Sequence, residues 1–292
     1  EGQTIPHLLF FAFQATFCII TTALVSGAVV ERVRFGPFLV FSTLWSILVY
    51  AVLAHWVWGG GWLQDGGTLD FAGGVPVEMA SGFSALAAAI VVGSRRDWGR
   101  QAFLPHNAVF VLLGAGLLWF GWFGFNAGSN LESNYYAVLA MANTFLATAA
   151  AGMSWVLVEW ITKGKPSLLG IASGMVAGLV AVTPMAGFAG PMGAIIAGLI
   201  VSPICLFFCS TVKSMLGYDD ALDVFGGPDR LEHAIREAHT EDVENGRAPE
   251  EVVHATGKTS ESRCPGDYSI RPSGSANRST RTPSGPGSIQ TE

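Results

Sequence analysis

Seven long apolar runs, joined by short polar segments, constrain this chain more than any other feature. About 20 helical residues cross a hydrocarbon core of ~30 Å, and each run reaches or approaches that length. Only 13% of the residues are charged, against roughly 25% in soluble domains. We therefore expect an all-α polytopic membrane protein with spans near residues 6–30, 36–58, 75–94, 104–128, 135–161, 167–185 and 188–213.

Charge divides the chain into two predicted parts. Residues 1–216 hold eight Lys/Arg and eight Asp/Glu, whereas residues 217–292 hold eight Lys/Arg and fourteen Asp/Glu. The second part ends in a Ser-, Pro- and Gly-rich stretch of the kind that stays disordered. We expect a transmembrane body over 1–216 and a polar, acidic, largely disordered tail over 217–292.

The basic residues predict an orientation. All eight Lys/Arg of the body follow the first, third, fifth or seventh run, and the other loops carry none. Cytoplasmic loops are enriched in Lys and Arg, so the side that these residues share is expected to be cytoplasmic. The protein is then expected in a cell (plasma or inner) membrane, with its N-terminus outside the cell and its tail in the cytoplasm. The basic residues are Arg32, Arg34, Arg95, Arg96, Arg100, Lys163, Lys165 and Lys213.

Small residues predict close helix packing in the sixth run. "GIASGMVAG" places Gly170, Gly174 and Gly178 four residues apart, so one helix face is bare backbone that a neighbour can approach.

Aromatic and polar groups at membrane depth are the candidates for function. They gather in "AFQATF", "AHWVWGGGWLQDGGTLDFAGG", "LLWFGWFGFNAGSN" and "NTFLATAAA". Ordinary interpretations compete: tryptophans at the boundary form aromatic belts, and Phe13 and Phe17 at helical spacing fit packing. Asp70 precedes a glycine turn and fits a cap of backbone amides. Glu78, two residues after Pro76, fits the first turn of a helix, where a carboxylate meets the positive end of the dipole.

Together these groups favour a small cation as the substrate. Aromatic faces attract cations, and a hydroxyl can accept a hydrogen bond from one. A bare charge at the bilayer centre costs at least ~2.5 kcal/mol, so an apolar passage favours a species that can lose its charge with a proton. Ammonium is the simplest such species.

Other classes have little support in the residues. Cys18, Cys205, Cys209 and Cys264 show no metal-ligand spacing. There is no nucleophile–base constellation or nucleotide loop, so we expect no enzyme activity, no metal, no cofactor and no nucleic-acid partner. A seven-span receptor fits the topology by count, but the seventh run lacks a mid-helix lysine for a retinal-type chromophore.

Seven stretches of the chain resemble motifs of a known family. They are "AHWVWGGGWL", "LDFAGG", "RQAFLPHN", "GWFGFNAGS", "NTFLATAAA", "GKPSLLG" and "DDALDVFG". The chain resembles the ammonium transporter family (Amt/Mep/Rh), in its Amt branch, from about residue 5 to 226. The resemblance implies a bundle of eleven helices built from two inverted halves, of which about seven spans fall in this chain. It also implies a homotrimer with one pore per subunit, ammonium or ammonia as substrate in a lipid bilayer, and a possible cytoplasmic regulatory protein.

The resemblance also implies roles for particular residues. Trp58 and Ser129 would form an outer ammonium recruitment site, with Phe17 over it, and Phe17 and Phe125 would form a stacked gate below. Asp70 would shape the site without holding the ion. Trp122 and Asn126 would line or brace the same region.

Two departures from the family pattern stand out. Glu78 occupies the position of the first of two pore histidines, as it does in some members, and Pro228 stands about where the second belongs. We interpret the chain as incomplete, with a frame shift favoured over a regulatory tail, and expect poor transport. An ammonium sensor of the same family, or a non-transporting truncated fragment, is the alternative.

Overall fold

The computed structural model describes residues 4–96, 98, 106–212, 215, 217 and 219, and every regular element among them is a helix. The chain divides into two units, 1–237 and 238–292, and the described residues all belong to the first. The expectations for Pro228 and for the predicted tail therefore lie outside the described residues, apart from isolated positions up to Asp219.

Thirteen helical segments make up the described fold. In chain order they are α1 (His7–Ser26), α2 (Phe35–Trp45), η1 (Ser46–Tyr50), α3 (Ala51–Trp58), α4 (Trp62–Asp65), η2 (Gly74–Met79), α5 (Ala80–Val92), α6 (Ala108–Gly128), α7 (Tyr135–Lys163), α8 (Leu168–Val182), η3 (Thr183–Met185), α9 (Pro191–Phe207) and η4 (Phe208–Val212).

Within the described ranges these segments join into seven helices long and apolar enough to cross a membrane. The prediction of seven spans is confirmed. The second, Phe35–Asp65, runs beyond its predicted end because the short helix α4 follows α3 after the Gly59–Gly61 turn.

The outward helix faces carry large apolar side chains that no other part of the described structure shields. Leu8, Ile90, Val91, Met153 and Ile161 are each more than 60% exposed. Water does not tolerate apolar surface on this scale in a monomeric protein, whereas a bilayer does, and helices satisfy their own backbone there. The chain is a multi-pass membrane protein.

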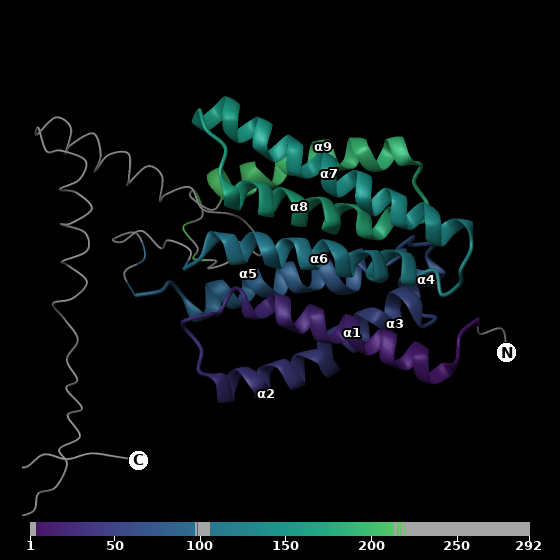
Figure 1. The fold of residues 1–292 in the computed structure, drawn as a ribbon. Helices are drawn as coiled ribbons and strands as arrows, with labels where there is room; N and C mark the ends of the chain where they lie inside the picture. The colour runs from purple at the N-terminus through teal and green to yellow at the C-terminus, as the bar shows by residue number, and fades with distance from the viewer. Residues whose placement is uncertain are drawn as a thin grey trace, which may run out of the picture. The chain divides into compact units, whose positions relative to one another are not determined.

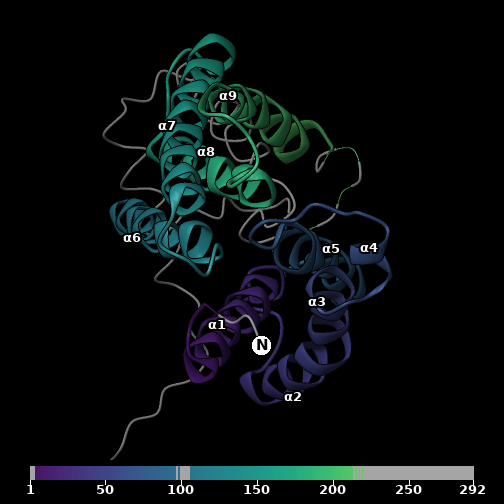
Figure 2. The ribbon, with the colours of Figure 1, turned by 90° about the vertical axis from the view of Figure 1, so that its right-hand side faces the viewer.

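Two groups of helices are visible in the described part. Helices α6, α7, α8 and α9 pack on one another, and α1 packs on η2 and α5 in the second group (Figures 1 and 2). Glycines allow the closest approaches to α7. A Cβ at Gly178 would lie 2.7 Å from the carbonyl oxygen of Ala147, and one at Gly198 would lie 2.3 Å from it. The predicted close packing of the "GIASGMVAG" face is confirmed.

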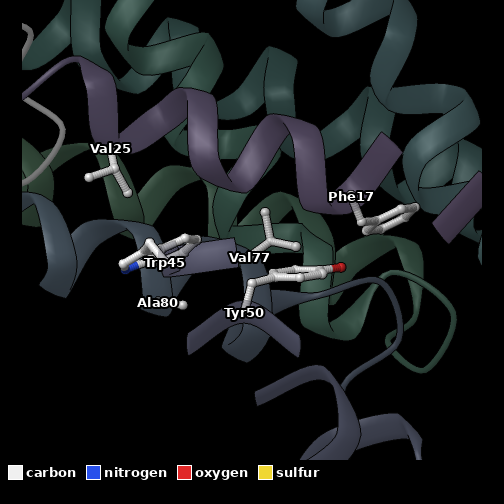
Figure 3. Close-up of a cluster of buried hydrophobic side chains, with 6 residues drawn as sticks. All are labelled: Phe17, Val25, Trp45, Tyr50, Val77 and Ala80. Atoms are coloured by element: carbon white, nitrogen blue, oxygen red, sulfur yellow. The ribbon is translucent and has the colours of Figure 1, made fainter. Parts of the chain in front are cut away.

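One buried cluster packs α1 against four other helical segments. Phe17 and Val25 from α1 pack with side chains from α2, η1, η2 and α5 (Figure 3). Phe17 is 1% exposed, so its ring direction is set by this packing. The other members are Trp45, Tyr50, Val77 and Ala80.

A charged cluster joins the ends of α1 and α5 to the segment after η4. The Asp219 carboxylate accepts hydrogen bonds from the backbone N–H of Arg95 at 2.8 Å and from its guanidinium at 2.9 Å. Arg32 lies 3.8 Å from the same carboxylate, and Glu31 lies 3.4 Å from Arg95. Burial raises the pKa of Asp219, but the hydrogen bonds from Arg95 and the charges of Arg95 and Arg32 outweigh it and hold the pKa below its usual value.

Candidate functional site

Four aromatic rings from three helices form a continuous series, which we call the aromatic stack. Phe17 of α1 stacks on Phe125 of α6, with ring centroids 4.3 Å apart and 27° between planes. Trp122, also of α6, stacks on Phe125, with ring centroids 4.7 Å apart. Trp58 of α3 meets Phe17 edge-on at 6.0 Å and 88°. Offset and edge-to-face contacts of this kind are the favoured geometries of aromatic pairs.

The Trp58 end of the aromatic stack is tethered to the loop before η2. The indole N–H of Trp58 donates to the backbone carbonyl of Asp70 at 3.0 Å. The Asp70 carboxylate accepts from the backbone N–H groups of Gly73 and Gly74 at 2.8 Å and of Val75 at 2.7 Å. Gly73 adopts φ +113°, a conformation suited to glycine. Asp70 thus caps the amides that open η2 and fixes the loop that holds Trp58.

The Trp122 end is tethered through hydroxyl groups. The Trp122 indole N–H donates to the Thr183 hydroxyl at 2.9 Å, and Asn126 donates to the Thr144 hydroxyl at 2.9 Å. Thr183 also lies 3.3 Å from the Asn126 amide oxygen. All four side chains are at most 3% exposed. The sequence interpretation missed Thr183, although a threonine before Pro184 inside an apolar run is the kind of signal that could have found it.

Ser129 lies one turn beyond Phe125 at the end of α6. Its hydroxyl donates to the Phe125 carbonyl at 2.7 Å, which leaves the oxygen lone pairs able to accept a hydrogen bond. Within the described structure Trp58 donates to Asp70 instead of to Ser129.

Glu78 lies in η2, below the amides that Asp70 caps. One oxygen of its carboxyl group is buried and has no hydrogen-bond partner among the described residues. The amides at the start of η2 go to Asp70, so the capping role is already filled. A buried carboxyl oxygen without a donor is costly, so its presence calls for an explanation such as a functional role, local strain or a bound water.

The described ranges contain no candidate metal site. No group of three or more His, Cys, Asp or Glu side chains there could hold a metal ion.

The fold and the stacked rings define a class: a polytopic helical membrane protein with an aromatic stack between its helices. The family profile described as "Ammonium Transporter Family" matches residues 1–226. The chain belongs to the ammonium transporter family.

Several named proteins are similar to the chain. It is 53% identical over 225 residues to an ammonium transporter of Bacillus subtilis (strain 168), covering 77% of this chain and 55% of that protein. It is 52% identical to an ammonium transporter of Aquifex aeolicus (strain VF5), covering 76% and 52%. The chain spans about half the length of the curated relatives it matches.

Solved structures share the fold. The crystal structure of Candida albicans Mep2 matches with a TM-score of 0.72 and 40% identity, over 76% of this chain and 50% of that one. A structure described as "Sensor Amt Protein" matches with a TM-score of 0.70 and 32% identity, over 74% and 56%. The predicted resemblance and helical-bundle fold are confirmed.

Proposed function

We propose that the chain takes part in moving ammonium across a membrane, as its relatives' names describe for them. The observation that carries the proposal is the aromatic stack, because the hydroxyl of Ser129 at the end of α6 bonds to the carbonyl of Phe125, a member of the stack. A cation near a tryptophan face gains about 0.5–2 kcal/mol, and ammonium can also donate a hydrogen bond to a hydroxyl oxygen. Potassium and sodium cannot donate one, so the pair favours ammonium.

Phe17 and Phe125 act as the gate in this proposal. Their rings are in contact, and Phe17 is 1% exposed, so passage requires a ring to rotate. A charged ion would lose its hydration in such a place, which is expensive at membrane depth. The gate therefore favours neutral ammonia over the bare ion.

Glu78 is the proposed pore-lining group beyond the gate. Its carboxyl oxygen without a partner is able to accept a hydrogen bond from ammonia or ammonium. A protonated carboxyl can also donate one, so the group can serve the exchange that histidine serves elsewhere in the family.

The setting of the site follows the charge pattern. We propose a cell membrane as the location, with the N-terminal side outside and the loops at 31–35, 95–103 and 162–166 in the cytoplasm. Residues 217–292 would then form a cytoplasmic tail able to meet a regulatory protein. A homotrimer with one pore in each subunit is the proposed assembly.

Ammonium sensing is the second candidate, favoured by the similarity to the structure named "Sensor Amt Protein". Uptake of labelled methylammonium by proteoliposomes separates the two. A transporter accumulates label in proportion to protein content. In that case Trp58→Leu raises the methylammonium concentration needed for half-maximal uptake. A sensor binds methylammonium, seen as a change in tryptophan fluorescence, without uptake. If the protein shows no uptake and no binding of methylammonium, both candidates are wrong.

A further inference from the structure

Both ends of the aromatic stack lead to the same short turn, η3. At one end the Thr183 hydroxyl accepts the Trp122 indole N–H. At the other end the neighbouring Pro184 contacts the loop that tethers Trp58. The backbone N–H of Phe71 donates to the Pro184 carbonyl at 3.0 Å, and Phe71 directly follows Asp70, whose carbonyl accepts from Trp58.

Steric contacts reinforce this connection. A Cβ at Gly74 would lie 2.6 Å from the Pro184 Cβ, and one at Gly187 would lie 2.0 Å from the Phe71 ring. Real Cβ contacts essentially never fall below 3.0 Å, so a side chain at either glycine would force its neighbour to shift. The loop 70–74 and the segment 183–188 are therefore seated against each other without room to slide.

Thr183 is placed to set the direction of the Trp122 ring. The hydroxyl has one hydrogen, and its nearer acceptor is the Leu179 carbonyl at 2.8 Å. That bond leaves a lone pair directed at Trp122. Thr183 is 0% exposed, so water cannot replace the bond, and an indole N–H buried without an acceptor is expensive.

We propose that η3 is the shared anchor of both ends of the aromatic stack, with Thr183 as the positioning residue that couples the Trp122 tether to the Trp58 tether. The proposal rests on the proposed function for the meaning of the stack as a site and gate. Coupling here requires only direct contacts: Trp122 to Thr183, Thr183 to Pro184 along the chain, and Pro184 to Phe71 and Gly74. Physical contact alone does not demonstrate coupling, so the test must measure both ends.

The test uses the whole chain in detergent micelles with ¹⁵N-labelled tryptophan indoles. The chain holds nine tryptophans, and the signals of Trp122 and Trp58 are assigned by their loss in Trp122→Phe and Trp58→Phe. Thr183→Val keeps the shape and removes the hydroxyl, and Thr183→Ser restores it. The matched control is Thr148→Val, because Thr148 is also 0% exposed and, among the described residues, its hydroxyl bonds to the Thr144 carbonyl alone.

We expect Thr183→Val to move the indole signals of both Trp122 and Trp58, while Thr183→Ser and Thr148→Val leave them in place. A reciprocal variant approaches from the other side. Gly74→Ala should push Pro184 and move the Trp122 signal as well as that of Trp58, whereas Gly82→Ala, where a Cβ meets nothing within 4 Å, should move neither. If each variant moves only the nearer signal, the two tethers are independent and the proposal is wrong.

A methylammonium titration tests the proposed function separately from the anchor role of η3. The titration with methylammonium is followed at the Trp58 signal. Because Thr183→Val loses one buried hydrogen bond, its half-saturation concentration should rise about twofold to tenfold. Thr183→Ser should match the unaltered chain. An unaltered chain that shows no response to methylammonium defeats the proposed function, while the ligand-free spectra still decide the anchor. Equal titrations in Thr183→Val and the unaltered chain, with a normal response, defeat the positioning role.

Discussion

The rings of Phe17 and Phe125 lie 4.3 Å apart and nearly parallel, although they come from α1 and α6. Phe17 is also almost fully buried, with 1% of its surface exposed. The neighbours of the two rings, Trp58 and Trp122, are each held by an indole hydrogen bond. The proposed gate is thus a pair of rings between two tethered tryptophans, and each member can be altered separately.

Removing one ring of the pair should open a leak. We expect Phe17→Ala in proteoliposomes to let protons pass at a rate above that of the unaltered chain, measured with an internal pH-sensitive dye. Truncation of a buried Phe also costs about 3–5 kcal/mol of stability, so folded protein must be quantified first. Phe11→Ala is the control, since Phe11 lies on the same helix and is 65% exposed. Equal leaks in the two variants would remove the gate role.

Trp58→Leu should weaken methylammonium binding about twofold to thirtyfold, the range of a cation–π contact. The measurement is the concentration dependence of uptake or of the fluorescence change. Trp62 is the matched control because it lies in the next helix, is 63% exposed and fits an aromatic belt. If Trp62→Leu and Trp58→Leu act alike, both tryptophans belong to the belt.

Asp70→Ala should destabilise the protein by about 2 kcal/mol, because its carboxylate accepts from three backbone amides and the loss of a cap typically costs about 0.5–2 kcal/mol. Asp70→Asn should lose less, since one acceptor oxygen remains. Unfolding in a denaturing detergent, followed by circular dichroism, measures the difference. The exposed Asp65 provides the control, and a comparable loss in Asp65→Ala would show that the destabilisation does not come from the hydrogen bonds between Asp70 and the amides of η2.

Acid should weaken the charged cluster at the ends of α1 and α5. The pKa of Asp219 is lowered in the folded protein, so its contribution to stability is fully present above the unfolded value, about 3.9, and is lost as pH falls through the lower folded value. Asp219→Asn should flatten the stability profile below about pH 4 and destabilise the protein at pH 7, because Arg95 and Arg32 stay buried without that partner. An unchanged acid limb in Asp219→Asn would assign acid sensitivity elsewhere.

Much of this architecture follows from the sequence because its signals are local. Apolar length predicted the seven spans, and the glycines spaced by four predicted the close face of α8 on α7. The partners of the stack could not be predicted from local patterns. Thr183 meets Trp122 only after α6 and α8 are packed, and Pro184 meets Gly74 only because η3 interrupts the helix at that level. The interpretation of Glu78 as a helix cap, which fits its position after Pro76, illustrates the same limit, since the sequence does not show that the Asp70 carboxylate accepts from three amides at the start of η2.

Glu78 provides the sharpest test of the pore. Its buried carboxyl oxygen has no partner among the described residues, and Asp70 already fills the capping role. Glu78→Gln keeps the shape and a hydrogen-bond acceptor but cannot ionise. If Glu78 exchanges a proton with the substrate, methylammonium uptake by Glu78→Gln should lose the part of its pH dependence that arises from the carboxyl group, while Glu78→His should shift that dependence toward the range where imidazole titrates, near pH 6.5. Ser81→Ala is the control, since Ser81 lies one turn further on and its hydroxyl donates only to the Glu78 backbone carbonyl. Parallel pH profiles in all four proteins, with differences confined to thermal stability, would show that Glu78 lies outside the path of the proton.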